Sequence, residues 1–501
     1  MSWDIICIGS GITALAFAAQ MVARYPGKRI LILEKHYLPG GYATVFRRKQ
    51  SRFDCSLHKL SGMGEGGNSQ RIFSQLGLDA ELEFVYPSTY FEALWDEGSH
   101  PLSNDYATCK RQLRELFPEE KGLERLFEDI ETHGRNGYYQ FQIMDGSFRP
   151  DIPQLRFAHK HLRRVTVAEK FQELFSSPLP REILAAPAIY VGGFPEDFSY
   201  LYYLHVLYAT LVRGNAYIRR GSQHLSNVLV KRVKDSGGDV RLRTEVQRIL
   251  VDGSNHAYGV ETNRGTFLGS QIYINASPHY ALDHLFPQLD CLPPVQEKLR
   301  DLKPSWSTTT LYAVTDRPPE ELGLTSSEMM VLSSGFEEAS ELRQACRGGL
   351  ADERTCERAF WELSTMEVTN YHLLDPSGGN VICLNLLDGM RHWPSRDTPE
   401  YAAKKERARS MMLERLLRYR PELRGHIQYQ DCSSPHTYER YTHNHAGAGY
   451  GALVGTDTTS HVFHYNFPVQ GIHFLSAWVA GPSYEAAFGY AEMKARTYRD
   501  S

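Results

Sequence analysis

Two glycines and one acid near the start of the chain have the types and spacing needed to hold phosphate and ribose groups. Gly9 and Gly11 follow a short apolar run, Ala14 stands three positions later, and Glu34 comes 23 positions after Gly11. Gly9 permits a tight turn, and Gly11 lets the backbone approach a pyrophosphate at the positive end of a helix. Ala14 is an accepted substitute for a third glycine, since that position needs only close contact between helix and strand. A carboxylate such as Glu34 binds ribose hydroxyls.

The segments that must position these residues have the patterns of a strand, a helix and a second strand. Asp4 to Ile8 is a short apolar run, and residues 11 to about 24 have apolar side chains at helical spacing. Residues 30–34, ILILE, form a second apolar run that ends in the acid. This βαβ unit is the context in which the glycine motif binds a dinucleotide. The alternative is a Rossmann-like unit without a ligand.

A second glycine pair distinguishes NAD from FAD. Gly40 and Gly41 follow Glu34 by six and seven positions, and a basic, strand-like stretch comes after them. Paired glycines at this place let a loop lie against the cofactor again, whereas a nicotinamide-binding domain more often continues into its third strand unit. The spacing therefore favours FAD.

Three stretches of this block carry a likeness to a known family: IICIGSGITAL, LEKHYLPGGYATVFRRKQSRFD and SLHKLSGM. The chain resembles the flavin amine oxidase superfamily, and within it the group of phytoene desaturases, carotenoid isomerases and retinol saturases. Residues 216–262 and 471–495 resemble the segments with which this family returns to its FAD-binding domain. The resemblance implies an α/β fold, with a Rossmann-like, glutathione reductase-like FAD-binding domain and a discontinuous α+β substrate domain.

The resemblance also implies which residues contact FAD. They are the glycine turn, the acid, the Gly-Gly loop, the loop of His58, the strand ends near Val246 and Ala276, and the closing segment. The implied residues are Gly9, Ser10, Gly11, Ile12, Thr13, Ala14, Glu34, Lys35, Gly40, Gly41, Tyr42, Ala43, His58, Val246, Ala276, Ser277, Ala477, Trp478, Pro482, Tyr484, Glu485 and Ala486.

Three positions depart from the family pattern. Tyr42 replaces an arginine found in many amine oxidases, and Ala477 replaces an acid that often holds the ribityl chain. Arg220 stands where the group usually has a second glycine before Gly221. These departures leave FAD as the expected cofactor.

The likeness implies two discontinuous domains. The FAD-binding domain comprises 1–90, 212–285 and 445–501, and the substrate domain comprises 91–211 and 286–444. Composition supports this division, since the first set has glycine turns and short apolar strands. Residues 105–210 are instead rich in helical patterns with few glycines.

His58, His443 and Tyr450 are the candidates for catalysis. His58 is interpreted either as a proton donor or flavin-tuning group, or as a hydrogen-bonded structural histidine. His443 and Tyr450 lie in YTHNHAGAGYGA, residues 441–452, which we expect to close the substrate cavity. His443 and His445 would also suit a metal, but no further ligands can be named, and we predict no metal site. A bound flavin carries out the redox step itself, so a missing catalytic dyad does not exclude an enzyme.

Two aromatic clusters indicate either core packing or the wall of a long apolar tunnel. They are Tyr138, Tyr139 and Phe141, and then Tyr200, Tyr203 and Tyr208. The basic stretch 156–171 has apolar side chains between its charges. It predicts a solvated helix face, with peripheral contact to anionic lipid as the alternative.

Bulk composition limits the remaining classes. A length of 501 residues predicts two or three domains, and a net charge of −4 gives no sign of nucleic-acid binding. The eight cysteines are scattered without a C-x-x-C pair, which argues against zinc or a disulfide scaffold and suits a reducing compartment. The sequence contains no run of about 18 uncharged apolar residues, so we predict no membrane-spanning helix. We expect a cytoplasmic protein, with membrane association as the alternative.

These observations favour an FAD-dependent oxidoreductase of the desaturase, isomerase or saturase type. Its substrate would be a hydrophobic unsaturated molecule such as a carotenoid, retinoid or other polyene lipid. One alternative is flavin-dependent oxidation of an amine or amino-acid unit, free or bound to a carrier protein. Another is a prenyl-binding escort protein of the GDP dissociation inhibitor kind, against which the intact fingerprint with Glu34 argues.

Overall fold

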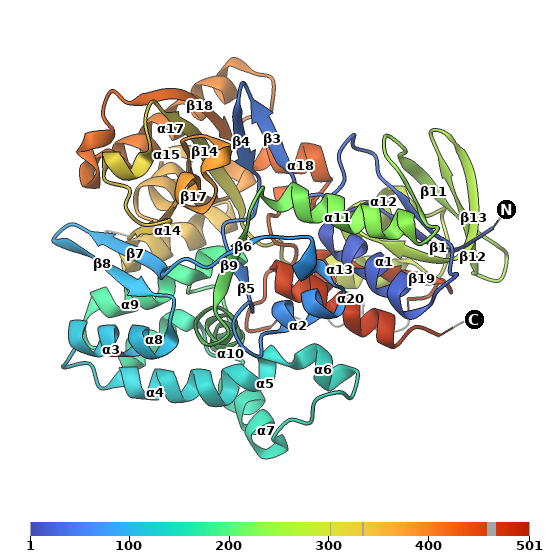
Figure 1. Ribbon diagram of the computed structural model, residues 1–501, viewed down its shortest axis with the longest axis horizontal. Coiled ribbons are helices and arrows are strands. Elements are labelled where there is room, and N and C mark those ends of the chain that lie inside the picture. Colours follow the sequence, from blue (N-terminus) through green and yellow to red (C-terminus); the bar gives the residue numbers. More distant parts are fainter. Residues whose placement is uncertain (1, 301, 333–334, 458–466, 500–501) are drawn as a thin grey trace.

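The apolar run at the start of the chain forms strand β1, Trp3–Ile8, and the segment after the glycine turn forms helix α1, Ile12–Arg24. The second apolar run forms β2, Ile30–Leu33, parallel to β1. The predicted βαβ unit is therefore confirmed. The computed structural model describes residues 2–300, 302–332, 335–457 and 467–499 (Figure 1).

β1 lies in a seven-stranded sheet whose strands come from the start, the middle and the end of the chain. Its order is β10 (Asp239–Arg241), β2, β1, β13 (Gly265–Ile274), β12 (Ala257–Thr262) and β11 (Val246–Val251), with β19 (Ile472–Phe474) paired to β13. β10, β2, β1, β13 and β19 are parallel, whereas β12 and β11 are antiparallel. α1 packs against α11 (Ser222–Asp235) and α20 (Tyr484–Arg496) beside this sheet (Figure 1).

A second seven-stranded sheet forms the other half of the molecule (Figure 1). Its order is β18 (Ile427–Ser433), β14 (Ser307–Thr315), β17 (Val381–Asp388), β16 (Met366–Asn370), β15 (Glu328–Val331), β7 (Thr89–Trp95) and β8 (Gly98–Ser103). Neighbouring strands are antiparallel except for β15 and β7. Helix α17 (Pro399–Tyr419) packs on β14 and β18.

The segment with helical patterns forms helices, as expected. They are α3 (Tyr106–Leu116), α4 (Gly122–Asp129), α5 (Arg135–Tyr138), α6 (Gln140–Met144), α7 (Ile152–His161), α8 (Val167–Leu174), α9 (Pro178–Ala185) and α10 (Tyr200–Leu207). The basic stretch 156–171 is divided between α7 and α8. Phe157 is 45% exposed, whereas Leu162 and Val167 are buried.

Short sheets and helices complete the fold. They are β3 (Val45–Arg48) with β4 (Ser51–Asp54), the sheet of β5 (Leu60–Ser61), β9 (Asn215–Ile218) and β6 (Phe84–Val85), and the helices α2 (Asn68–Gln75), α12 (Pro278–His284), α13 (Pro293–Arg300), α14 (Phe336–Gly348), α15 (Glu353–Glu357), α16 (Tyr371–Leu374), α18 (Pro435–Thr442) and α19 (Ala477–Ala480).

Each large sheet has its own apolar core. The mixed α/β class and the Rossmann-like half match the fold predicted from the sequence. The exact domain limits stay a prediction, and residues 458–466 and 500–501 of the predicted FAD-binding domain lie outside the described residues. In the described part of the chain, no helix combines the length and apolar character needed to cross a bilayer.

Candidate functional site

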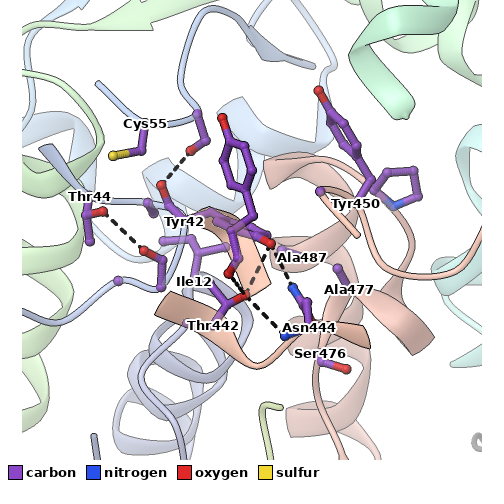
Figure 2. Close-up of a pocket in the computed structure, with 18 of the residues that line it drawn as sticks. Ile12, Tyr42, Thr44, Cys55, Thr442, Asn444, Tyr450, Ser476, Ala477 and Ala487 are labelled. Atoms are coloured by element: carbon purple, nitrogen blue, oxygen red, sulfur yellow. Dashed lines mark hydrogen bonds between the residues drawn. The ribbon is translucent and has the colours of Figure 1, made fainter. Parts of the chain in front are cut away.

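A cavity of about 810 Å³ is lined by residues from both large sheets. Figure 2 shows Ile12 and Tyr42 from the N-terminal block facing the same space as Asn444, Ala477 and Ala487 from the end of the chain. Of the 22 predicted FAD-contacting residues, all except Ser10, Ala14 and Ser277 line this cavity. Those three are fully buried behind its wall.

The two glycine turns fit against each other and against Asn275. Gly9 has a φ of +88°, and a Cβ there would lie 2.6 Å from the Asn275 carbonyl oxygen, so the tight turn requires glycine. A Cβ on Gly11 would lie 2.3 Å from Asn275 Oδ1. A Cβ added to Gly41 would lie 3.1 Å from the Gly11 Cα, so Gly41 packs directly on Gly11. The missing side chain of Gly11 therefore makes room for the Asn275 carboxamide, and the expected approach of its backbone to a pyrophosphate stays a prediction.

The N-terminus of α1 is open toward the cavity. Gly11 precedes the helix without a capping side chain, and the first turn carries no acidic residue. Gly11, Ile12 and Thr13 line the cavity. The first N–H groups of a helix have no partner within the helix and attract anions. This arrangement fits the pyrophosphate of a dinucleotide.

Glu34 is fixed at the end of β2 and lines the same cavity. Its Oε2 accepts hydrogen bonds from Ser10 N at 2.8 Å and Ser10 Oγ at 2.7 Å, while its Oε1 accepts one from His36 N at 2.8 Å. Carboxylate oxygens have further lone pairs for a ribose hydroxyl. Ser10, behind the cavity wall, therefore positions the acid that lines the cavity.

Tyr42 links the Gly-Gly turn to the closing segment. Its hydroxyl donates to the Ala448 carbonyl oxygen at 2.9 Å. It accepts from Asn444 Nδ2 at 3.1 Å (Figure 2). Asn444 Oδ1 in turn accepts from Trp478 Nε1 at 3.0 Å. The replacement of arginine by tyrosine thus gives a polar chain that joins segments about 400 residues apart.

The departure at Arg220 has a local explanation. Arg220 and Gly221 both have positive φ angles, +73° and +78°, so a glycine pair would suit this turn. Asp375 Oδ2 accepts from the Arg220 backbone N at 2.8 Å and holds the strained residue. Asp54 Oδ2 accepts from Ser222 N at 2.7 Å at the start of α11.

Glu485 is a buried carboxyl on the cavity wall. It contacts the Tyr138 hydroxyl, and its Oε2 accepts from Ser61 Oγ at 2.8 Å. Burial raises the pKa of Glu485 to about 7, although these hydrogen bonds oppose the rise. Next to it, the Tyr484 hydroxyl lies 2.7 Å from Ser56 Oγ.

The three catalytic candidates line the cavity, each in a different setting. His58 Nδ1 lies 2.8 Å from the Tyr371 hydroxyl and 3.1 Å from Thr369 Oγ1. Burial lowers the pKa of His58, which favours a neutral imidazole. Burial also lowers the pKa of His443 and raises that of Tyr450.

His445 does not line the cavity but stacks on His279, with ring centroids 4.3 Å apart. Among the described residues, no three His, Cys, Asp or Glu side chains gather as metal ligands would.

The aromatic clusters divide between core and cavity. Tyr138 and Phe141 line the cavity, whereas Tyr200 and Tyr203 are fully buried in the core. Tyr139 and Tyr208 do not line the cavity either. The part of the wall near α10 instead comes from Tyr202, His205, Val206 and Ala209.

A row of polar side chains on the second sheet was missed by the sequence interpretation. Ser433, Thr310, Asn385 and Glu367 are paired across β18, β14, β17 and β16, and all line the cavity. Thr310 Oγ1 donates to Asn385 Oδ1 at 2.9 Å, and Asn385 Nδ2 donates to Glu367 Oε2 at 3.2 Å. Burial raises the pKa of Glu367 to about 7. The signals in the sequence were Glu367 within MEVTN and Asn385 within the largely apolar VICLNLLD.

Comparisons with known proteins agree with this geometry. Residues 7–76 match the family described as NAD(P)-binding Rossmann-like domain. Over 480 residues the chain is 25% identical to the all-trans-retinol 13,14-reductase of Rattus norvegicus, covering 90% of this chain and 77% of that protein. It is 27% identical over 333 residues to the phytoene desaturase of Cercospora nicotianae, covering 63% and 51%. It is 22% identical over 478 residues to the chloroplastic prolycopene isomerase of Daucus carota, covering 90% and 72%.

Solved structures share the fold. An oxidoreductase from Methanosarcina mazei has a TM-score of 0.62 at 14% identity, covering 97% of this chain and 98% of that one. Cyclohexylamine oxidase from Brevibacterium oxydans has a TM-score of 0.61 at 17% identity, covering 99% and 98%. The resemblance drawn from the sequence is confirmed: this chain is similar, over nine-tenths of its length, to all-trans-retinol 13,14-reductase and prolycopene isomerase, and over a shorter stretch to phytoene desaturase.

Proposed function

We propose that this chain is an FAD-dependent oxidoreductase of the desaturase, isomerase or saturase type that acts on a hydrophobic unsaturated substrate. The observation that carries the proposal is a single cavity with two kinds of wall. One wall has an open helix N-terminus, two glycine turns and Glu34, which fit FAD. The other has a face of the second sheet and the side chains of Tyr202, His205 and Val206 on α10. Relatives named for the reduction, desaturation or isomerisation of polyenes support the substrate class.

The side chains around the cavity have defined tasks in this proposal. The N-terminus of α1 would hold the pyrophosphate, Glu34 the ribose, and the closing segment from Ala477 to Ala486 the rest of the cofactor. When bound, FAD supplies hydride transfer to or from a carbon of the substrate. The Tyr42–Asn444–Trp478 chain holds the closing segment in place. Glu485, with a pKa raised to about 7, can give or take a proton at neutral pH at its carboxyl oxygens.

The proposal is tested by reconstituting the purified protein with FAD under anaerobic conditions. The oxidised protein is incubated with a hydrogenated polyene, the chemically reduced protein with all-trans-retinol, and both with primary amines. We expect a polyene either to change the flavin absorbance in one of the two directions or to be isomerised without such a change, and amines to leave the absorbance unchanged. Bleaching by amines alone, with hydrogen peroxide released in air, would favour the amine alternative and contradict the proposal. Cyclohexylamine oxidase shares the fold and supplies no evidence on the substrate of this chain.

We also propose a cytoplasmic location, supported by eight free cysteines scattered over both halves of the molecule.

Peripheral contact with anionic lipid through α7 and α8 is a separate proposal, supported by the basic side chains around exposed Phe157. Sedimentation with phosphatidylserine vesicles tests it. We expect the Phe157→Asp variant to lose binding to the vesicles. If the wild-type protein does not sediment with them, the result contradicts the proposed lipid contact.

A further inference from the structure

One carboxyl oxygen on the cavity wall lacks a partner. Glu367 is 1% exposed, and its Oε2 accepts the hydrogen bond from Asn385. Its Oε1 is buried and has no hydrogen-bond partner among the described residues. A buried polar atom left without a partner destabilises the structure. Glu367 lines the cavity, so a molecule in the cavity can supply the missing partner.

Asn385 and Lys59, two polar neighbours of Glu367, do not satisfy this oxygen, because their own bonds fix them. Asn385 accepts from Thr310 through Oδ1, which directs its amide group to Glu367 Oε2. Lys59 is the cation that interacts with Glu367. Its ammonium group already donates to Glu328 at 2.9 Å, to the Tyr190 hydroxyl at 3.0 Å and to the Tyr90 carbonyl oxygen. All three Lys59 donors are therefore occupied.

We propose that Glu367, oriented by Asn385, is a specificity-determining residue that binds a hydroxyl group of the substrate. This inference rests on the proposed function, because it concerns the substrate part of the same cavity. An ionised carboxyl needs a hydrogen-bond donor, whereas a protonated carboxyl needs an acceptor. A hydroxyl group provides both, while an ammonium group provides only donors. The pKa of Glu367, raised to about 7 by burial, makes both protonation states available at neutral pH.

The test compares three probes with FAD-loaded protein. They are all-trans-retinol, its hydrocarbon analogue without the hydroxyl, and its primary-amine analogue. Binding is measured from quenching of protein fluorescence without turnover, and FAD content from the visible spectrum. The variants are Glu367→Leu, which removes the polar atoms, and Glu367→Gln, which keeps a group that can both donate and accept. Glu92→Gln is the control, since Glu92 is a buried acid of the same sheet that pairs with Arg420 outside the cavity.

In the wild-type protein we expect the alcohol to bind about 10- to 100-fold more tightly than the hydrocarbon, the range expected for a hydrogen bond to a charged group. Glu367→Leu should remove this difference, whereas Glu367→Gln should retain most of it and Glu92→Gln all of it. An unchanged preference for the alcohol in Glu367→Leu overturns the inference. The inference is also overturned if the wild-type protein binds the amine more tightly than the alcohol and if Glu367→Gln removes this preference for the amine. If the wild-type protein does not retain FAD, or does not bind even the hydrocarbon, the result contradicts the proposed function instead.

Discussion

Replacement of Gly11 by alanine tests how the glycine turn is built. The new Cβ would lie 2.3 Å from Asn275 Oδ1, a distance that side chains in folded proteins do not tolerate. The Asn275 carboxamide also donates from Nδ2 to the Leu475 carbonyl oxygen at 3.2 Å, so its displacement breaks a link between β13 and β19. We expect a loss of about 1–3 kcal/mol in the free energy of unfolding, as for other overpacked sites. Gly253→Ala is the control, because its Cβ would meet nothing within 4 Å.

The assay is urea unfolding of the FAD-free protein, combined in a double-mutant cycle with Asn275→Ala. This second substitution removes the Oδ1, Cγ and Nδ2 atoms that the Gly11 Cβ would meet. We expect Gly11→Ala to cost at least about 0.5 kcal/mol less in the Asn275→Ala background, the smallest coupling typical of residues in contact. An equal cost in both backgrounds would refute the assignment of Gly11 to Asn275. A loss confined to FAD affinity would show that Gly11 serves the pyrophosphate and not the packing of Asn275.

Three further substitutions test the rest of the site. Glu34→Ala should weaken FAD binding by about 1.5–3 kcal/mol, measured by titration of the apoprotein, and an unchanged affinity would contradict the ribose assignment. Burial raises the pKa of Glu485 to about 7, so the stability that its protonated form contributes is full below about pH 4.5 and is lost as the pH rises through 7. The free energy of unfolding of Glu485→Gln, minus that of the wild type, should therefore increase by up to about 3 kcal/mol between pH 5 and pH 8. Urea unfolding measures both values, and a difference that does not change with pH would contradict this prediction. Tyr42→Phe leaves Asn444 Nδ2 without its tyrosine acceptor and should lower the unfolding free energy by about 1–3 kcal/mol, whereas an unchanged midpoint would show that the link contributes nothing.

The parts of the molecule with local sequence patterns could be predicted. β1, α1 and β2 follow from apolar spacing within about 30 residues, and the glycine turn and Glu34 follow from the same stretch. The resemblance to a family placed the closing segment, including Ala477 and Glu485, on the same cavity. Whether these residues contact FAD stays a prediction until the cofactor is located.

The polar row on the second sheet could not be predicted, because it depends on strand register. Glu367 and Asn385 are 18 residues apart in sequence, and Thr310 is 75 residues from Asn385. Nothing in the order of residues states which strands are neighbours or which residues face each other. The room that Gly11 leaves for Asn275 is of the same kind, since Asn275 directly follows strand β13, more than 260 residues away in the sequence.

The central claim is that the two ends of this chain enclose one FAD molecule in the cavity. The most direct measurement is a crystal structure of the protein reconstituted with FAD, together with the number of FAD molecules bound per chain. We predict one FAD per chain, with its pyrophosphate at the N-terminus of α1 and its ring system beside the segment from Ala477 to Ala486. A protein that remains colourless after reconstitution, or an FAD molecule located away from this cavity, would contradict the account.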